Sequence, residues 1–80
     1  MYYIYILKSH NKNWHYVGMT ENVQKRLAEH NSGITPSTKP FAPFDVIYTE
    51  SYKDKEECRK REIRIKKNHA LKKALIPSLK

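Results

Sequence analysis

Apolar residues occupy both sides of the first segment of the chain, residues 2–8, which reads YYIYILK. Successive side chains of an extended strand point to opposite sides of a sheet. One side here carries Tyr3, Tyr5 and Leu7, and the other carries Tyr2, Ile4 and Ile6. Two apolar sides predict a central strand. The polar residues 9–13 (SHNKN) are typical of a turn, and strand-like character resumes over 14–19, so we expect an antiparallel hairpin.

A helix is predicted from about residue 21 to residue 31. Thr20 stands where an N-cap is expected, and Asn31, Ser32 and Gly33 supply a stop signal. At helical spacing the apolar stripe of this segment consists of Val23, Leu27, His30 and Ile34.

The second half of the chain predicts one strand and two further helices. Residues 35–44 (TPSTKPFAPF) hold three of the four prolines, so we expect a loop with at most one short helical turn. Residues 44–52 contain VIY and read as a third strand. Asp54, with Glu57 three positions later, predicts the start of a helix over 55–67, which lacks glycine and proline. ALKKALI predicts a short helix before Pro77.

These elements predict an α+β fold of the α/β class, with a small, mostly antiparallel three-stranded sheet flanked by helices. Eighty residues with 39% hydrophobic content suit one domain, residues 1–80. No apolar run approaches the roughly 20 residues of a membrane span, and no cleavable leader is evident, so we expect a cytoplasmic protein. Cys58 is alone, which excludes an internal disulfide, and the four histidines show no zinc-site spacing.

Charge changes this picture, because the chain carries 16 Lys+Arg against 8 Asp+Glu, a formal net charge of +8. Such a balance attracts polyanions and makes nucleic acid the first partner to test. The simpler alternative is a solvated helix face. The cationic residues of the C-terminal half are Lys55, Arg59, Lys60, Arg61, Arg64, Lys66, Lys67, Lys72 and Lys73.

Glu62 falls on the inward stripe of the second predicted helix. That stripe consists of Cys58, Glu62, Ile65 and His69. A carboxylate that faces a core is costly unless it meets a cation, a metal ion or several hydrogen-bond donors. The alternative is a partly exposed glutamate that bridges to a nearby arginine or lysine.

Arg26 and His30 lie one helical turn apart and share a flank of the first predicted helix. Taken alone, Arg26 is more often a solvated side chain and His30 a hydrogen-bonded boundary residue. Plain packing also accounts for many of the six tyrosines, and for Tyr2 and Tyr48 we prefer it.

Four segments in a fixed order nevertheless carry a family resemblance. They are YYIYILKS, YVGMT, QKRLAEHN and REIRIKK. Together they resemble the GIY-YIG nuclease domain, and the set is similar to its small standalone bacterial members. The resemblance covers a core of about residues 2–67 and leaves 68–80 as a helical tail. The matching positions are Tyr3-Ile4-Tyr5, Tyr16-Val17-Gly18, Arg26, His30 and Glu62.

The resemblance implies a metal-dependent endonuclease that hydrolyses phosphodiester bonds. Glu62 is then the ligand of one divalent ion, Mg²⁺ or Mn²⁺, a role that suits a hard oxygen ligand. Arg26 clamps the phosphate through its planar fork. Tyr5, Tyr16 or both orient and deprotonate the attacking water, and His30 hydrogen-bonds a tyrosine or the phosphate.

The resemblance also extends to the substrate and the partners. We assign substrate binding to Gly18, Lys39, Arg61 and Lys66. We expect low sequence specificity, DNA rather than RNA, a role in DNA repair, and a monomer whose specificity can come from a protein partner.

Two positions depart from the family pattern. Tyr3 replaces the first glycine, and residues 70–80 contain no asparagine, for which Asn68 is a poor match. The alternative function is therefore a nucleic-acid-binding module that keeps the fold without effective cleavage. Glu62 discriminates between the two, because metal binding there favours the enzyme and a salt bridge to Lys or Arg favours the binder. A third, weaker hypothesis is a basic helix that docks an acidic protein.

Overall fold

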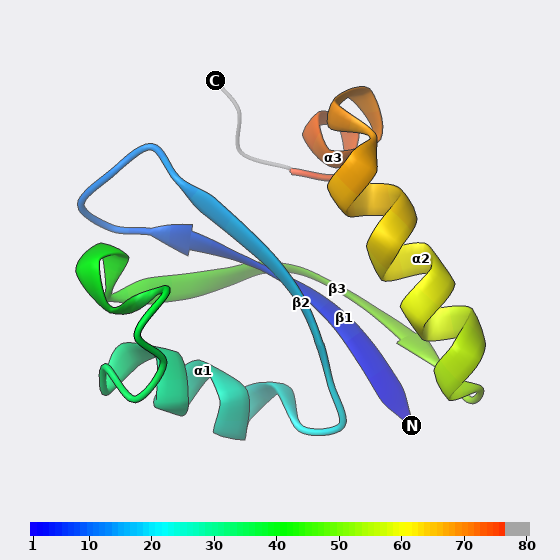
Figure 1. The fold of residues 1–80 in the computed structure, drawn as a ribbon, viewed down its shortest axis with the longest axis horizontal. Coiled ribbons are helices and arrows are strands. Elements are labelled where there is room, and N and C mark those ends of the chain that lie inside the picture. The colour runs from blue at the N-terminus through cyan, green and yellow to red at the C-terminus, as the bar shows by residue number, and fades with distance from the viewer. Residues whose placement is uncertain (77–80) are drawn as a thin grey trace.

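The computed structural model describes residues 1–76, which form a three-stranded antiparallel sheet with helices on both sides (Figure 1). The strands β1 (Tyr2–Ser9), β2 (His15–Thr20) and β3 (Phe44–Tyr52) are arranged in the order β2-β1-β3. The predicted α+β class, the central position of the first strand and its hairpin with the second are therefore confirmed.

Helices α2 (Lys55–Lys67) and α3 (His69–Leu75) cover one side of the sheet. Figure 1 shows α1 on the opposite side from α2, so the sheet is the middle layer. The cluster between the sheet and α2 and α3 is built on Ile4, Ile6, Val17, Cys58, Ile65 and Ile76. Burial of such side chains stabilises the fold by about 1.5–3 kcal/mol each.

Helix α1 (Val23–Asn31) covers the other side together with η1 (Lys39–Phe41), a short 3-10 turn in the predicted loop. The aromatic rings of Trp14 and Phe41 stack at a centroid distance of 4.0 Å and close the end of this layer. The second buried cluster consists of Tyr5, Leu7 and Phe44. Each side of β1 thus contributes side chains to a separate core, as its two apolar faces predict.

The start of α1 differs from the prediction. Asn22, not Thr20, is the N-cap, and its side chain accepts a hydrogen bond from the backbone N–H of Lys25 at 3.0 Å. Thr20 instead uses its hydroxyl oxygen to accept from the backbone N–H of Asn22 at 3.1 Å, which tightens the turn before the helix. Ile34 is 68% exposed and does not belong to the apolar stripe, because the helix has already ended at Asn31.

Both ends of α2 confirm the predicted helix, but the stripe predicted to continue to residue 69 is wrong. Asp54 is the N-cap and accepts from the backbone N–H of Glu56 at 3.1 Å. The helix ends at Lys67, and the extended backbone and side chain of Asn68 start α3. His69 is therefore exposed on a new helix and does not continue the stripe that contains Glu62.

Asn31 connects α1 to β3. Its side-chain oxygen accepts from the backbone N–H of Phe44 at 2.6 Å, and its side-chain amide donates to the carbonyl of Phe44 at 3.3 Å. This contact holds the helix at a fixed position along the sheet. No helix among residues 1–76 has the length and apolar character needed to cross a membrane. Pro77 and the rest of the predicted tail lie outside the described residues.

Candidate active site

Gly18 lets the phenol of Tyr5 lie directly over strand β2. The two residues are partners in the β1–β2 ladder. A Cβ atom at position 18 would lie 2.5 Å from Cζ of Tyr5 and also against its Oη, a contact that real side chains do not make. The glycine is therefore required by the close approach of Tyr5 to the backbone of the edge strand.

Tyr5 is almost fully buried, and its phenol contacts His30. The Oη of Tyr5 is 3.2 Å from Nε2 of His30. Burial raises the pKa of Tyr5 to about 12, although the nearby Arg26 guanidinium acts in the opposite direction. The ring of the half-buried Tyr16 lies beside both, with its centroid 6.2 Å from that of Tyr5 and 5.0 Å from that of His30.

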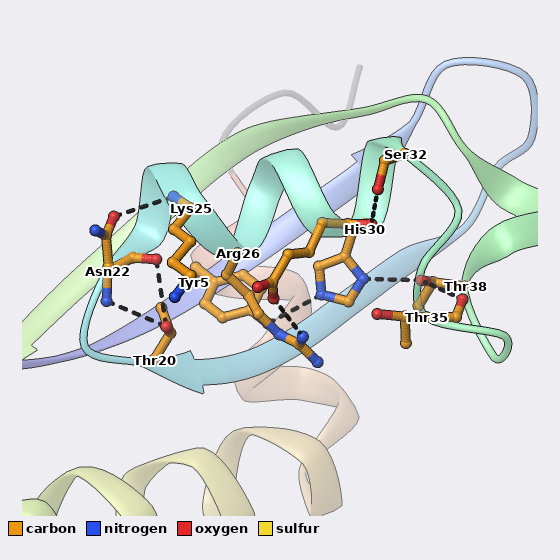
Figure 2. Close-up of polar contacts among 10 residues, drawn as sticks. Tyr5, Thr20, Asn22, Lys25, Arg26, His30, Ser32, Thr35 and Thr38 are labelled. Carbon is orange, nitrogen blue, oxygen red and sulfur yellow. Dashed lines mark hydrogen bonds and ion pairs between the residues drawn. The ribbon is translucent and has the colours of Figure 1, made fainter.

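His30 is fully buried and has a polar partner on each ring nitrogen. Besides the contact with Tyr5, its Nδ1 is 2.8 Å from the hydroxyl oxygen of Thr38 (Figure 2). Burial lowers the pKa of His30, and the positive charge of Arg26 lowers it further. His30 thus lies between the sheet and the loop that follows α1, in surroundings that disfavour its charged form.

Arg26 extends from the same flank of α1, as Figure 2 shows. Its Nη1 donates to Oε1 of Glu29 at 2.8 Å, and this hydrogen bond raises the pKa of the guanidinium. The side chain is 33% exposed and lines a surface pocket of about 260 Å³ together with Thr20 and Lys25. Arg26 therefore combines a fixed position with open donors that can bind an anion.

Glu62 lies on α2, on the other side of the sheet from α1, and its charge acts on Tyr5. Its side chain is 14% exposed, and its negative charge contributes to the raised pKa of Tyr5. Oε2 of Glu62 is 3.1 Å from Nζ of Lys66, which lies 5.9 Å from the ring centroid of Tyr16. The inward position is confirmed, and so is the expected alternative of a bridge to a nearby lysine.

Glu62 offers a single carboxylate, which suits a hard divalent ion that takes its other ligands from water and substrate. Among residues 1–76 there is no group of three or more His, Cys, Asp or Glu side chains that could hold a metal ion. Mg²⁺ commonly binds one or two carboxylates and completes its shell with water and substrate phosphate. The nearly buried carboxylate of Glu62 fits that mode of binding.

Arg61, one of the residues assigned to substrate binding, lies elsewhere. The guanidinium of Arg61 donates to both carboxylate oxygens of Glu50 at 3.0 and 2.9 Å, on the side of the sheet that α2 covers. Tyr48 and Tyr52 also donate to this carboxylate. Lys39 begins η1 and is exposed. By contrast, Gly18, also assigned to substrate binding, lies against Tyr5 in the group of candidate catalytic residues.

Sequence reasoning missed two members of the group, Thr38 and Glu29. Thr38 is fully buried in the proline-rich loop, where no periodicity identifies inward positions. Glu29 follows Arg26 by three residues, a spacing that permits an ion pair on a helix. The spacing that identifies Glu29 is present in the sequence, whereas the position of Thr38 depends on how the loop folds.

Comparisons with known proteins agree with this fold. The family model described as the GIY-YIG catalytic domain matches residues 1–74. UPF0213 protein VNG_2274C of Halobacterium salinarum is 38% identical over 77 residues, which cover 94% of this chain and 99% of the relative. UPF0213 protein CPE1444 of Clostridium perfringens is 38% identical over 68 residues, covering 84% and 72% of the two chains. No solved structure matches.

Proposed function

This chain belongs to the GIY-YIG catalytic domain family, and from that premise we propose that it is a divalent-metal-dependent endonuclease. One observation supports this most strongly. The phenol of Tyr5 on β1 contacts His30 and lies beside Arg26, both on α1 (Figure 2), and the charges of Arg26 and of Glu62 on α2 both act on its pKa. A base, a phosphate clamp and a metal ligand thus converge from three elements.

Tyr5 is the general base of the proposed reaction. Its hydroxyl oxygen lies 3.2 Å from Nε2 of His30, a nitrogen that accepts the proton of the phenol in the proposed reaction. The phenolate oxygen then takes a proton from the attacking water. Tyr16, whose ring lies beside Tyr5 and is more exposed, orients that water.

Arg26 binds the scissile phosphate. Glu29 holds one edge of the guanidinium, which leaves the remaining N–H groups to donate to phosphate oxygens. The same charge stabilises the extra negative charge that develops on the phosphorus oxygens in the transition state. An arginine keeps its charge at every working pH, so this contribution does not titrate.

Glu62 would hold the metal ion, Mg²⁺ or Mn²⁺. A divalent ion at this carboxylate supplies Lewis-acid stabilisation of the leaving oxygen. Lys66 competes with the cation for Glu62, but the lysine side chain is 47% exposed and the two residues form an i,i+4 pair within one helix. Such pairs contribute only about 0.3–0.5 kcal/mol, so Lys66 can turn to the substrate phosphate instead.

The exposed side of α2 supplies the nonspecific part of binding. Its exposed cationic side chains are Lys55, Arg59, Lys60, Arg64, Lys66 and Lys67. Contacts of this kind position the phosphate backbone without reading the bases. We therefore propose a substrate class of DNA with unpaired or branched structure and low sequence specificity.

The bridge between Glu62 and Lys66 favours a second candidate function. If the lysine keeps the carboxylate occupied, the same surface binds nucleic acid without cutting it. The two functions differ in one property, because only the nuclease requires a divalent ion at Glu62.

A cleavage assay tests the proposal. Labelled single-stranded, duplex and branched DNA and RNA are incubated with the protein and Mg²⁺, Mn²⁺ or EDTA. We expect metal-dependent cutting, strongest on branched or unpaired DNA, that Glu62→Ala and Arg26→Ala abolish. Binding of the same substrates without cutting under any condition would instead support the binding module.

A further inference from the structure

The hydroxyl of Thr38 has two acceptors within reach. Its Oγ1 lies 3.3 Å from the backbone carbonyl oxygen of Thr35 and 2.8 Å from Nδ1 of His30. If Thr38 donated to Nδ1, His30 would carry its hydrogen on Nε2 and donate it to Tyr5, and the buried phenolic hydrogen of Tyr5 would have no acceptor among residues 1–76. All three side chains are satisfied only when Thr38 donates to Thr35, His30 donates to Thr38 and Tyr5 donates to His30.

This order determines the tautomer of His30. A neutral imidazole carries one N–H, and here that hydrogen is on Nδ1. Nε2 therefore presents its lone pair to Tyr5, whose hydroxyl donates across the 3.2 Å contact. A chain of donors thus runs from Tyr5 through His30 and Thr38 to the carbonyl of Thr35, and Figure 2 shows these contacts in sequence.

The surroundings prevent the ring of His30 from turning over to exchange its nitrogens. The ring is fully buried, with the ring of Phe44 packed edge-on at 6.0 Å and that of Tyr16 tilted against it at 5.0 Å. Thr38 itself is fully buried, so water does not replace its hydroxyl as a partner.

We infer that Thr38 is a positioning residue that keeps His30 in the Nδ1-protonated tautomer and so leaves Nε2 free to receive the proton of Tyr5. The catalytic consequence rests on the proposed nuclease function, whereas the tautomer does not. In the reaction the O–H bond of Tyr5 breaks and its proton moves to Nε2. The phenolate then takes a proton from water, and the resulting hydroxide attacks phosphorus as the leaving oxygen departs.

Removal of the Thr38 hydroxyl should reverse the direction of the contact with Tyr5. In Thr38→Val the shape of the side chain is kept, but Nδ1 loses its acceptor. The imidazole then gains more from carrying its hydrogen on Nε2 and donating it to the oxygen of Tyr5. In that state His30 cannot accept the phenolic proton. Thr38→Ser keeps the hydroxyl and is the matched control.

Nuclear magnetic resonance of protein with ¹⁵N-labelled histidine tests the tautomer directly, with no need for cleavage. Long-range ¹H–¹⁵N spectra distinguish a protonated from an unprotonated ring nitrogen. We expect Nδ1–H for His30 in the wild type and in Thr38→Ser, and Nε2–H in Thr38→Val. An Nε2–H tautomer in the wild type, or an unchanged tautomer in a folded Thr38→Val, would overturn the inference. The wild-type measurement decides it even if Thr38→Val does not fold.

Single-turnover cleavage tests the catalytic consequence separately. We expect the rate of Thr38→Val to fall by about 100-fold or more with substrate affinity unchanged, because a histidine in the wrong tautomer cannot act as the acceptor. Thr38→Ser should stay within about threefold of the wild type. If the wild type cuts and Thr38→Val cuts equally fast, the positioning role is wrong. If no protein cuts but the wild type shows Nδ1–H, the tautomer assignment stands and the proposed function fails.

Discussion

Tyr5 and His30 come from a strand and a helix, yet their side chains meet at 3.2 Å inside the fold, with 1% and 0% of their surfaces exposed. Burial shifts both pKa values away from the charged form, upward for Tyr5 and downward for His30. The buried surroundings therefore favour the neutral forms of both residues, which are joined by one hydrogen bond. Chemistry at this site depends on charges that arrive with substrate and metal.

The two tyrosines of the site should contribute unequally. Tyr5→Phe removes the hydroxyl that contacts His30 and should lower the single-turnover cleavage rate by about 10²–10⁴-fold, the usual range for a general base. Tyr16→Phe removes a more exposed hydroxyl and should cost less. Circular dichroism of both variants controls for the fold. A larger loss for Tyr16→Phe would assign the base to Tyr16.

Arg26 should not be replaceable by lysine. Arg26→Lys keeps the positive charge but loses the planar fork, so we expect cleavage to fall by about 10²–10³-fold. Lys25→Ala removes a neighbouring exposed cation and is the matched control, with an effect mainly on substrate affinity. Rates measured at saturating substrate separate an effect on cleavage from an effect on substrate affinity. Full activity in Arg26→Lys would show that charge alone is sufficient.

Gly18→Ala should destabilise the protein because the added methyl group meets the ring of Tyr5. We expect a loss of about 1–3 kcal/mol in the free energy of unfolding, measured by urea denaturation. The same change in a Tyr5→Ala background should cost much less, since the ring is gone. Equal costs in the two backgrounds would mean that Tyr5 does not occupy the space above Gly18.

Glu50 should make the fold sensitive to acid. Hydrogen bonds from Arg61 lower its pKa to about 2, assisted by Tyr48 and Tyr52. A carboxyl with a lowered pKa stabilises the fold above its ordinary value near 4.5 and loses that contribution as the pH falls toward 2. Since the pair is mostly buried, the contribution is about 3 kcal/mol at neutral pH.

Urea unfolding at pH 7 and pH 3 checks this contribution. Glu50→Gln should lose much of the stability at pH 7 and show a smaller difference between the two pH values. Glu21→Gln removes an exposed carboxylate and should leave stability within about 0.5 kcal/mol of the wild type. An unchanged pH dependence in Glu50→Gln would contradict the account of this cluster.

Periodicity predicted the layers of this fold because burial follows it. The two apolar faces of residues 2–8 became the two cores on either side of β1. The spacing of Cys58, Glu62 and Ile65 placed the carboxylate inward, where its side chain is 14% exposed. Both predictions rest on regular backbone geometry, which the sequence specifies locally.

Loops and helix ends were less predictable because several side chains can satisfy the same backbone group. Thr20 and Asn22 are both good caps, and the structure uses Asn22 for the helix and Thr20 for the preceding turn. Thr38 is one of several small polar residues among prolines, and only the folded loop brings its hydroxyl to His30. That contact between a helix and the irregular loop after it leaves no periodic pattern in the sequence.

The central claim is that Glu62 and Arg26 serve one metal-dependent cleavage reaction. Single-turnover cutting of branched DNA is measured for the wild type, Glu62→Gln and Arg26→Ala, each with Mg²⁺ and with EDTA. We expect cutting by the wild type with Mg²⁺ only, and a loss of at least about 100-fold in both variants, which still bind the DNA. Cutting that survives EDTA, or that Glu62→Gln retains, would contradict the claim.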